Sequence, residues 1–531
     1  MSWGRRFGSF GVAALVLSIG VTGPVATSEA AAAAANETSA KTSAEPLLPS
    51  GPGSDADEGT PLPPAAGAAG VEKRIAAMEE KAAESSRPLP DSYHKTAYAS
   101  RALSWLELPY NSPTEYGFDA SVPHDSTGVR MFSIDGRLYD HPVAQAQEAL
   151  EAISDYHLTG KAEYLTRAGL DAQRLIDRHV LSDDAWYFPY PFDFALHGGS
   201  DVMRAPWFSG MAQGQALSAF SRLYQITGAQ KWLDAATATF KSFLNAPAEG
   251  LPSTVNIDPS GYLWLEEYPL WPPTSSDRTL NGHVFATFGL FDYQALTADP
   301  AAVNLWNGAL AHTNWYLSNG FRNPGYLSHY CLRHKGVLND KYHDIHWHQM
   351  LLLHAASGDS AWSRYADALI ADYPPPAVTG TVMLAAGTHT AYKFDKNGAI
   401  TASKSISLSR RSSAPGDLRQ RVRGRGIYLR VTAGSLAGYS VAEQYAHAWL
   451  AGQKVTVTYP LARTVLIPAG QWSAYKYDSA GNTTASKTIS LSAPSSAPFS
   501  TSATINGRMQ VLVTAGSLSG YWLPSGDMTL Q

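Results

Sequence analysis

The sequence predicts a mainly α-helical domain followed by two small β-modules. Over about 300 residues, helical patterns break at short turns that recur every 60 to 70 residues. After residue 376 the pattern changes to alternating β-forming residues, with a second repeat whose period is near 83 residues. A chain of 531 residues has room for two or three domains. The two repeats therefore mark two different architectures within one chain.

The first 75 residues have the composition of an export signal followed by a tether. Arg5 and Arg6 precede an apolar segment, 10–21, that is too short to span a bilayer. We expect a signal peptide at 1–30. The order Arg5-Arg6-Phe7 is weakly typical of twin-arginine export, but an ordinary secretory signal is the preferred interpretation. Residues 31–75 are rich in Ala, Pro and Gly and are expected to form a disordered tether. The chain is therefore predicted to be secreted.

Bulk composition excludes several classes of function. The net charge of -5 gives no overall basic character, which argues against nucleic-acid binding but allows a local basic cleft for an acidic polysaccharide. No later segment is long and apolar enough to span a membrane. Cys331 is the single cysteine, so disulfides do not stabilise this fold. No cofactor is expected.

Four short breaks divide residues 76–374 into helix hairpins. Each break follows a helical pattern, as where Val143, Ala146 and Leu150 share one face behind Pro142. Glycine suits the helix C-cap at three of them. The breaks are Leu158–Lys161, Ile226–Ala229, Leu296–Asp299 and Ala356–Asp359, with the glycines at Gly160, Gly228 and Gly358. Hairpins with long connections suggest an α/α toroid with a cleft at one end of the ring. A simple helical bundle would not explain the Trp-, Tyr- and Pro-rich connections.

Two β-modules are expected at 377–442 and 460–531. Ala391–Asp395 in the first returns as Ala474–Asp478 in the second. The turn signal Asn397-Gly398 predicts a hairpin. The repeated aromatic residues are Tyr392 with Tyr475 and Tyr439 with Tyr521. They could stack on sugars or cell-wall polymer, or they could fill small β cores, and both interpretations stay open.

Two segments near the middle of the chain concentrate groups that can move protons. One contains Leu265–Pro269 and Leu280–Gly282, and the other runs from Tyr330 to Gln349. Six of the chain's 16 His lie between residues 329 and 354. Carboxylates, phenols, a guanidinium and imidazoles are the groups that proton transfer on an anionic substrate needs.

A uronic acid is such a substrate, because removal of its carbon-5 proton builds negative charge on the attached carboxylate. Arg333 is the best partner for that carboxylate, since a guanidinium binds it through two parallel hydrogen bonds. His334, His343 and His346 could help if they are protonated. The sequence therefore predicts a positively charged site for a sugar carboxylate.

Two tyrosines and one glutamate are the candidate acid–base groups. Tyr330 and Tyr342 could approach the sugar from opposite sides, with nearby positive charge lowering a phenol pKa from its usual value of about 10. Glu267 is the third candidate. Asn281 could hydrogen-bond the substrate or orient its carboxylate.

Structural explanations compete with this prediction. With 27 Tyr in the chain, most are core or loop residues. Tyr342, His346 and Gln349 also define one helix face that could simply pack under a loop. His343 and His346 have a spacing that can share a metal ion, but no HExxH motif is present and Cys331 is an isolated thiol. We therefore expect no metal.

Several motifs in this order resemble the C-terminal catalytic domain of heparan-sulfate and heparosan D-glucuronyl 5-epimerases. They are Pro142–Gln145, Ala205–Gln215, Leu265–Pro269, Leu280–Gly282 with Gly289–Asp292, Tyr330–His334 and Tyr342–Gln349. The resemblance covers roughly residues 90–374. It implies an incomplete α/α toroid, from a secreted bacterial-type member, that acts on a uronic acid within a polysaccharide. Cys331 and His283 stand where the family usually has an Asp and an aromatic residue.

The resemblance also implies roles for individual residues. Glu267, Tyr330 and Tyr342 fall on catalytic acid–base positions, and Tyr268, Asn281 and Arg333 fall on positions that contact the sugar or its carboxylate. The implied reaction converts D-glucuronate to L-iduronate units in a heparosan-type polymer. A uronate lyase begins with the same proton removal, and a glycoside hydrolase would need a carboxylate pair. A non-catalytic polysaccharide- or cell-wall-binding protein is the alternative from a different class.

Overall fold

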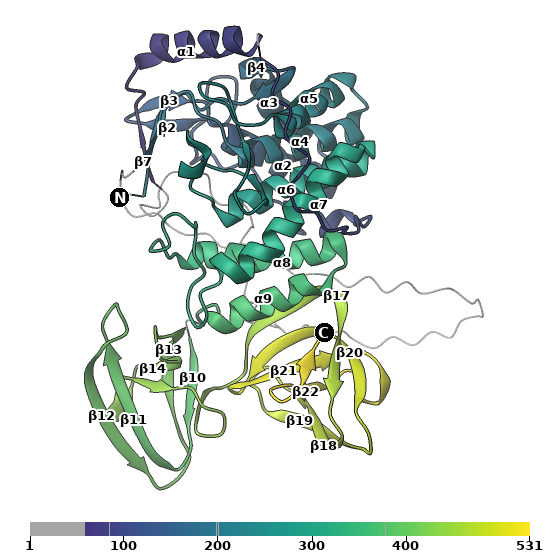
Figure 1. Cartoon of the computed structure of the whole chain (residues 1–531). Coiled ribbons are helices and arrows are strands. Elements are labelled where there is room, and N and C mark those ends of the chain that lie inside the picture. The colour runs from purple at the N-terminus through teal and green to yellow at the C-terminus, as the bar shows by residue number, and fades with distance from the viewer. Residues whose placement is uncertain (1–58, 84, 198, 200, 378) are drawn as a thin grey trace, which may run out of the picture.

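The computed structural model describes residues 59–83, 85–197, 199, 201–377 and 379–531 (Figure 1). It has a helical domain and two β-modules, as the sequence predicts, with the modules side by side below the helices in Figure 1. The expected signal peptide at 1–30 and the tether up to residue 58 lie outside the described residues. Among the helices described, none is both long and apolar enough to cross a bilayer.

The helical domain is a two-layered arc of four hairpins, as expected of an α/α toroid. The inner helices α2, α4, α6 and α8 pack against one another in that order, and each packs against the outer helix that follows it. The bounds are α2 Pro142–Thr159, α3 Ala162–Arg178, α4 Gly210–Thr227, α5 Gln230–Lys241, α6 Leu280–Thr297, α7 Pro300–Tyr316, α8 Asp340–Ser357 and α9 Ser360–Asp372. The inner helix α6 is buried along most of its length, whereas the outer helix α3 buries one face only.

All four hairpin turns use the same hydroxyl motif. A Thr or Ser in the last helical turn donates to the carbonyl oxygen four residues earlier and accepts from the backbone N–H two residues later. These hydroxyls belong to Thr159, Thr227, Thr297 and Ser357. The predicted C-caps Gly160, Gly228 and Gly358 are confirmed in the left-handed conformation, and Ala298 adopts the same conformation in the third turn.

The helices α4 and α6 touch through their backbones. A Cβ added at Gly214 would lie 2.3 Å from Cα of Ala286, and one added at Gly289 would lie 2.2 Å from the carbonyl oxygen of Gly214. Real Cβ atoms do not approach this closely. Both glycines are therefore required for the spacing between the two central helices.

The long connections form short antiparallel ladders. These are β2 Phe132–Ile134 with β3 Arg137–Tyr139, β4 Val180–Ser182 with β5 Ala185–Tyr187, β6 Asp193–Leu196 with β7 Asp201–Met203, and β8 Val255–Ile257 with β9 Leu263–Leu265. Short helical turns add η1 Trp105–Glu107, η2 Ser242–Leu244, η3 Pro273–Ser275 and the π-helical η4 Leu317–Phe321. Phe132 of β2 and Phe194 of β6 line a pocket, so two of these ladders help to wall the expected cleft.

Part of the predicted tether is structured. The strand β1, Gly59–Leu62, pairs antiparallel with β6, and the helix α1, Gly67–Ala82, lies across the top of the domain in Figure 1. Ile75 and Met78 of α1 pack against an apolar cluster that contains Tyr187. These contacts could not be predicted from the composition of the segment, because its few apolar residues pack against residues more than 100 positions away in the sequence.

The two β-modules have the same strand order. The first contains β10 Gly380–Leu384, β11 Gly387–Phe394, β12 Ile400–Leu408, β13 Ser412–Arg421, β14 Ile427–Val431, β15 Ser440–Ala442 and β16 Ala448–Leu450, with η5 Gly434–Leu436. The second contains β17 Gln453–Ile467, β18 Gly470–Tyr477, β19 Thr483–Leu491, β20 Ser495–Ile505, β21 Arg508–Val513, β22 Trp522–Pro524 and β23 Thr529–Leu530, with η6 Gly516–Leu518. Strand by strand, β12-β11-β15-β14-β13-β10-β16 corresponds to β19-β18-β22-β21-β20-β17-β23.

The module boundaries differ from the prediction, because β16 and the first residues of β17 lie outside the obvious repeat. The strand β16 pairs with β10, so the first module extends beyond 442. The second begins at Gln453 rather than 460. Its apolar residues join the core of the helical domain, where Tyr459 and Arg463 contact Asp367 of α9. The first module has a separate core.

Replacing Gly214 by alanine tests the contact between α4 and α6. Gly214→Ala is expected to lower the free energy of unfolding by about 1–3 kcal/mol, because the new Cβ meets backbone that cannot move aside. Gly169→Ala in α3 is the control, since its Cβ meets only the side chain of Trp232 at 4.0 Å. The free energy of unfolding of this control is expected to rise by about 0.5–1 kcal/mol. Denaturant unfolding measures both, and equal stability of the two variants would contradict the contact.

Candidate active site

An aromatic pocket lies where the four inner helices begin. His141 and Ser209 are the N-caps of α2 and α4, Asn281 is in the first turn of α6, and Tyr342 is in the first turn of α8. The full lining is Pro61, Phe132, His141, Val143, Tyr190, Phe192, Phe194, Trp207, Ser209, Met211, Glu267, Tyr268, Asn281 and Tyr342. The N-terminus of a helix carries a partial positive charge. Four helix N-termini around one pocket therefore favour an anionic ligand.

Glu267 is held rigidly in this pocket. It follows β9, and Oγ1 of Thr279 donates to its Oε2 at 2.7 Å. A Cβ added at Gly282 would lie 2.3 Å from the same oxygen, so only glycine fits beneath the carboxyl. Burial raises the pKa of Glu267 to about 7, although hydrogen bonds from Thr279 and Tyr268 lower it. Near neutral pH this carboxyl can therefore either accept or release a proton.

The two predicted tyrosines do not stand on opposite faces of a sugar. The rings of Tyr330 and Tyr342 are 4.5 Å apart between centroids and tilted by 59°. That separation is direct van der Waals contact and leaves no room for a sugar ring between them. Tyr342 lines the pocket, whereas Tyr330 supports it from the neighbouring loop. Glu267 and Tyr342 are therefore the two acid–base candidates that line the pocket.

Asn281 presents a side-chain amide to the pocket. Its backbone carbonyl accepts from Nε2 of Gln349 at 2.9 Å, which ties α6 to α8. Its Oδ1 is buried and has no hydrogen-bond partner among the described residues. A buried polar atom without a partner is costly, and a ligand in the pocket would remove that cost. This agrees with its predicted role in substrate binding.

His141 is a pocket residue that the sequence reasoning missed. Its Nδ1 accepts from the backbone N–H of Ala144 at 3.1 Å, which places the proton on Nε2. Burial and the charge of Arg130 lower its pKa to about 3, so the ring is neutral. The signal was a polar residue directly before Pro142, which is an N-cap position. The pocket thus gains a neutral N–H donor.

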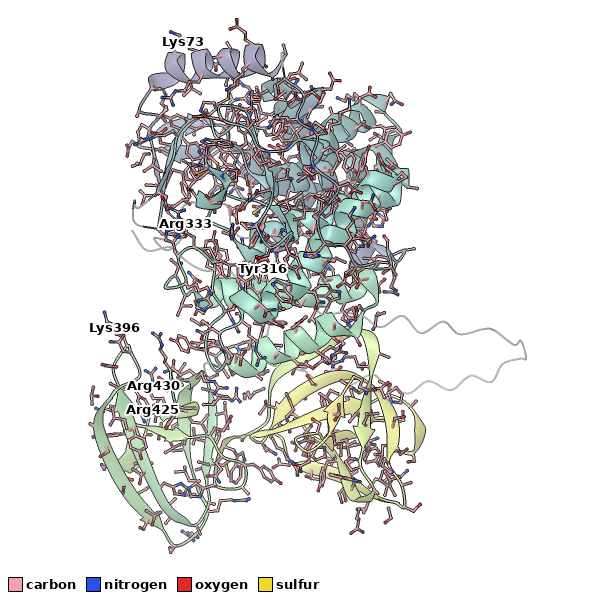
Figure 2. The ribbon with its side chains drawn as sticks, in the orientation of Figure 1. Lys73, Tyr316, Arg333, Lys396, Arg425 and Arg430 are labelled. Atoms are coloured by element: carbon pink, nitrogen blue, oxygen red, sulfur yellow. The ribbon has the colours of Figure 1, made fainter. Side chains whose placement is uncertain are left out.

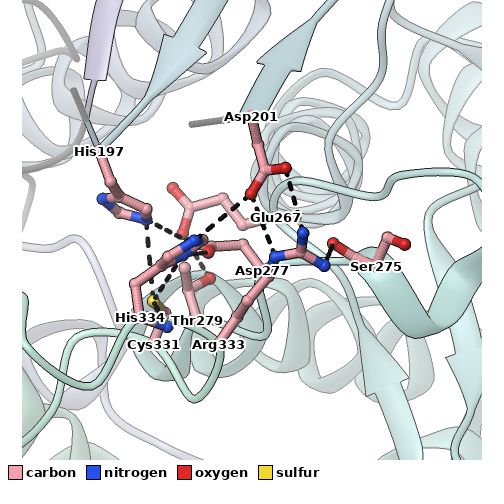
Figure 3. Close-up of polar contacts among 9 residues, drawn as sticks. All are labelled: His197, Asp201, Glu267, Ser275, Asp277, Thr279, Cys331, Arg333 and His334. Atoms are coloured by element: carbon pink, nitrogen blue, oxygen red, sulfur yellow. Dashed lines mark hydrogen bonds and ion pairs between the residues drawn. The ribbon is translucent and has the colours of Figure 1, made fainter. Parts of the chain in front are cut away.

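Arg333 does not offer its guanidinium to the pocket. It lies at an edge of the helical domain (Figure 2), and its Nε and one Nη bind both oxygens of Asp201 at 3.1 Å (Figure 3). The other Nη donates to the carbonyl oxygen of Ser275 at 2.7 Å. The predicted pairing with a substrate carboxylate is therefore corrected, because Asp201 already occupies the fork.

The predicted cationic role of His343 and His346 is also corrected. Both rings are fully buried. Nδ1 of His343 accepts from the N–H of Ser328 at 2.9 Å, and its Nε2 donates to the carbonyl oxygen of Leu369 at 2.9 Å. Burial lowers the pKa of His343 to about 4 and that of His346 well below its usual value. These imidazoles are neutral supports of α8 and do not carry charge to a substrate.

His334 belongs to a separate polar cluster beside Glu267. Its Nδ1 lies 2.7 Å from Oδ1 of Asp277, and Nε2 of His197 lies 2.8 Å from Oδ2 of the same carboxylate (Figure 3). Cys331 completes the cluster. The predicted contact of His334 with substrate is therefore replaced by a contact with Asp277. These four residues are the group in the described structure that could hold a metal ion.

Comparison with known proteins supports the resemblance seen in the motifs. The sequence profile described as "D-glucuronyl C5-epimerase C-terminus" matches residues 182–370, which contain Glu267, Asn281, Tyr330 and Tyr342 but not His141. The D-glucuronyl C5-epimerase of Caenorhabditis elegans is 32% identical over 95 residues, or 18% of this chain. The aligned part spans only 14% of the worm enzyme. The middle of this chain is thus similar to enzymes of the epimerase class.

Solved structures give weaker similarity. Cellobiose 2-epimerase from Spirochaeta thermophila is 16% identical with a TM-score of 0.33, covering 46% of this chain and 63% of that one. A family 76 glycoside hydrolase (mannosidase) from Bacteroides thetaiotaomicron is 15% identical with a TM-score of 0.28, covering 44% and 60%. Scores this low do not define a shared fold. The architecture above rests on the helix packing of this chain alone.

The neighbouring carboxyl, Glu266, provides a test of burial by pH. Burial raises its pKa to about 8 from 4.5. The folded state therefore keeps a proton that the unfolded chain releases, and this stabilisation is complete below 4.5 and is lost as the pH rises to about 8. Glu266→Gln stays neutral throughout. Its Tm relative to wild type is expected to rise across that window, and a difference independent of pH would contradict the assignment.

Proposed function

We propose that this chain is a polysaccharide D-glucuronyl 5-epimerase that converts D-glucuronate to L-iduronate units. The observation that carries the proposal is the pocket itself. Glu267, Tyr268, Asn281 and Tyr342 come from three separate segments and line one aromatic cavity at four helix N-termini. The matching sequence profile covers all four residues. The helix ends suit the substrate carboxylate, and the aromatic walls suit the apolar faces of a sugar ring.

The chemical step needs one proton acceptor and one donor on opposite faces of carbon 5. In this proposal the ionised Glu267 takes the carbon-5 proton, and the electron pair moves toward the sugar carboxylate. The Tyr342 hydroxyl then delivers a proton to the other face of the carbon. One proton leaves and one arrives, so the polymer keeps its composition and only its configuration changes. Tyr330 acts as a positioning residue through its ring contact with Tyr342.

Neutral donors stabilise the intermediate in place of the guanidinium that the sequence suggested. The amide of Asn281 and the Nε2–H of His141 face the pocket, where the developing charge on the carboxylate needs hydrogen bonds. The dipoles of α2, α4, α6 and α8 add in the same direction. Preorganised donors in a buried pocket are effective because they need no reorientation during the reaction.

A basic groove on the first β-module provides a second contact for an acidic polymer. It is lined by Arg421, Arg423 and Arg425 and, from the helical domain, by the loop 323–326. Arg423 lies 5.3 Å from the ring centroid of Tyr326. Arg425 lies on this module (Figure 2), where its Nε donates to the carbonyl oxygen of Gly398 at 3.0 Å. Clustered guanidinium groups with an aromatic neighbour fit the carboxylates and ring faces of a uronate polymer.

Two of the repeated tyrosines are poor candidates for that contact. Lys393 holds its ammonium 4.9 Å from the ring centroid of Tyr439, and Lys476 does the same at 4.8 Å from that of Tyr521. One face of each ring is therefore occupied. Tyr439 and Tyr521 also pack against the cores of their modules, so the basic groove is the better candidate for glycan contact, while both interpretations stay open for Tyr392 and Tyr475.

Hydrogen exchange at carbon 5 tests the proposed function. Heparosan-type polymer incubated with the protein in deuterated water is expected to gain deuterium at carbon 5 and L-iduronate signals in NMR spectra. Glu267→Gln and Tyr342→Phe should each slow the exchange by at least about 100-fold, because each removes a proton-transfer group. Tyr224→Phe, at the far end of α4, is the matched control and should keep the wild-type rate.

The products separate this function from its alternatives. Appearance of an unsaturated uronate chromophore with shorter chains would assign a lyase, and new reducing ends would assign a hydrolase. Absence of exchange with several uronate polymers would overturn the enzymatic proposal. Retained exchange in both Glu267→Gln and Tyr342→Phe would move the chemistry to another part of the pocket.

The groove predicts a charge-dependent affinity. Replacing both Arg423 and Arg425 with Gln is expected to weaken binding of heparosan-type polymer by up to roughly tenfold and to reduce its dependence on salt. The control is the double variant Arg410→Gln, Arg411→Gln. It removes the same amount of charge from exposed positions at the opposite end of β13. Affinity electrophoresis measures both. Equal losses in the two double variants would show that only net charge matters.

A further inference from the structure

Three loops that are far apart in the sequence bring four ligand-type side chains together. His197 follows β6, Asp277 precedes α6, and Cys331 and His334 precede α8. One ligand atom from each residue lies within 4.8 Å of all the others (Figure 3). His197 is 134 residues from Cys331. The fold therefore assembles a potential metal site from residues that the sequence leaves unconnected.

The distances fit a tetrahedral ion. Sγ of Cys331 lies 3.7 Å from Nε2 of His197 and 3.8 Å from Nδ1 of His334. Around tetrahedral zinc, with bonds of about 2.3 Å to sulfur and about 2.0 Å to nitrogen, a sulfur and a nitrogen ligand are about 3.6 Å apart. The two imidazoles lie 2.8 Å and 2.7 Å from oxygens of Asp277. These are two different atoms, Oδ2 and Oδ1, so only the pair that contains the ligating oxygen must widen, by about half an ångström, to reach the corresponding tetrahedral spacing.

We infer that His197, Asp277, Cys331 and His334 bind one zinc ion. The donor set is one thiolate, two imidazoles and one carboxylate, which together favour zinc over the hard cations magnesium and calcium. Asp277 and Cys331 are completely buried, while His334 is partly exposed and gives the ion a route of entry. Binding releases the thiol proton of Cys331 to solvent. The resulting complex of Zn²⁺, two anionic ligands and two neutral imidazoles has no net charge, which suits a buried position.

A second carboxylate orients one of the ligands. Oδ2 of Asp201 lies 3.4 Å from Nε2 of His334, the nitrogen that does not face the cluster. Carboxylates in this position fix the tautomer and ring orientation of histidines that bind metals. Arg333 in turn holds both oxygens of Asp201. This explains why the guanidinium is committed to Asp201, since it keeps the supporting carboxylate in place.

The ion would tie together the loops that carry the pocket. Cys331 directly follows Tyr330, and Asp277 lies two residues before Thr279, which holds Glu267. Thr279 and Cys331 also pair through their backbones. The inferred zinc is therefore a structural centre behind the pocket wall. Its four protein ligands complete a tetrahedral shell, as in structural rather than catalytic zinc sites. The inference does not depend on the proposed epimerase activity.

Metal analysis and cobalt spectroscopy of the full chain, without an affinity tag, test the site. After exposure to zinc and dialysis, mass spectrometric metal analysis is expected to find one zinc per chain. Replacement by Co²⁺ is expected to give a sulfur-to-cobalt charge-transfer band together with the intense visible bands of tetrahedral cobalt. Because Cys331 is the single cysteine, any such charge-transfer band identifies this site.

Variants assign the ligands. Cys331→Ser should abolish the charge-transfer band, and Asp201→Asn should weaken zinc binding by about 10-fold to 100-fold through the loss of ligand orientation. His447→Gln, in the first β-module, should leave both zinc content and spectrum unchanged. Absence of the band in the wild-type protein, or unchanged zinc retention in Cys331→Ser, would overturn the inference. If Cys331→Ser does not fold, the wild-type cobalt spectrum alone decides. A stoichiometric metal other than zinc would overturn the choice of ion.

Discussion

Close backbone packing between α4 and α6 links the core of the helical domain to the geometry of its pocket. Gly214 and Gly289 allow the two central helices to approach more closely than any side chain permits. Ser209 begins α4, and Asn281 lies in the first turn of α6, so this contact also sets the distance between two walls of the pocket. The close packing of α4 against α6 therefore also constrains the distance between pocket residues at the ends of these helices, because the helices are rigid.

The pocket combines an anion-favouring field with groups that are themselves neutral. Burial keeps His141, His343 and His346 uncharged, and it brings the pKa of Glu267 to about 7. Positive potential therefore comes from the helix ends and not from charged side chains. Such an arrangement can attract a carboxylate while leaving Glu267 free to ionise. A guanidinium in direct contact with Glu267 would instead hold its pKa low and weaken it as a base.

The connections between helices carry most of the special chemistry of this chain. Glu267 follows a short ladder, Arg333 in a loop pairs with Asp201 at the start of β7, and the cluster around Cys331 joins three connections. The two β-modules differ in how they pack against the helical domain. The second shares a core with the helical domain, whereas the first keeps its own core and presents a basic groove beside the loop 323–326.

The elements that depend on local physics could be predicted from the sequence. Helix periodicity, the C-cap glycines such as Gly160, and the repeat of the β-modules are encoded within short windows, and all were predicted. The residues Glu267, Asn281 and Tyr342 could be singled out because their motifs are compact. Features that depend on contacts between distant residues became visible only in the folded chain. His141 lines the pocket, and burial lowers the pKa of His343 so that its ring is neutral. The guanidinium of Arg333 pairs with Asp201, and His197 lies beside Cys331. Burial and pairing across more than a hundred residues leave no local pattern, because they arise only when separate loops meet around a shared core.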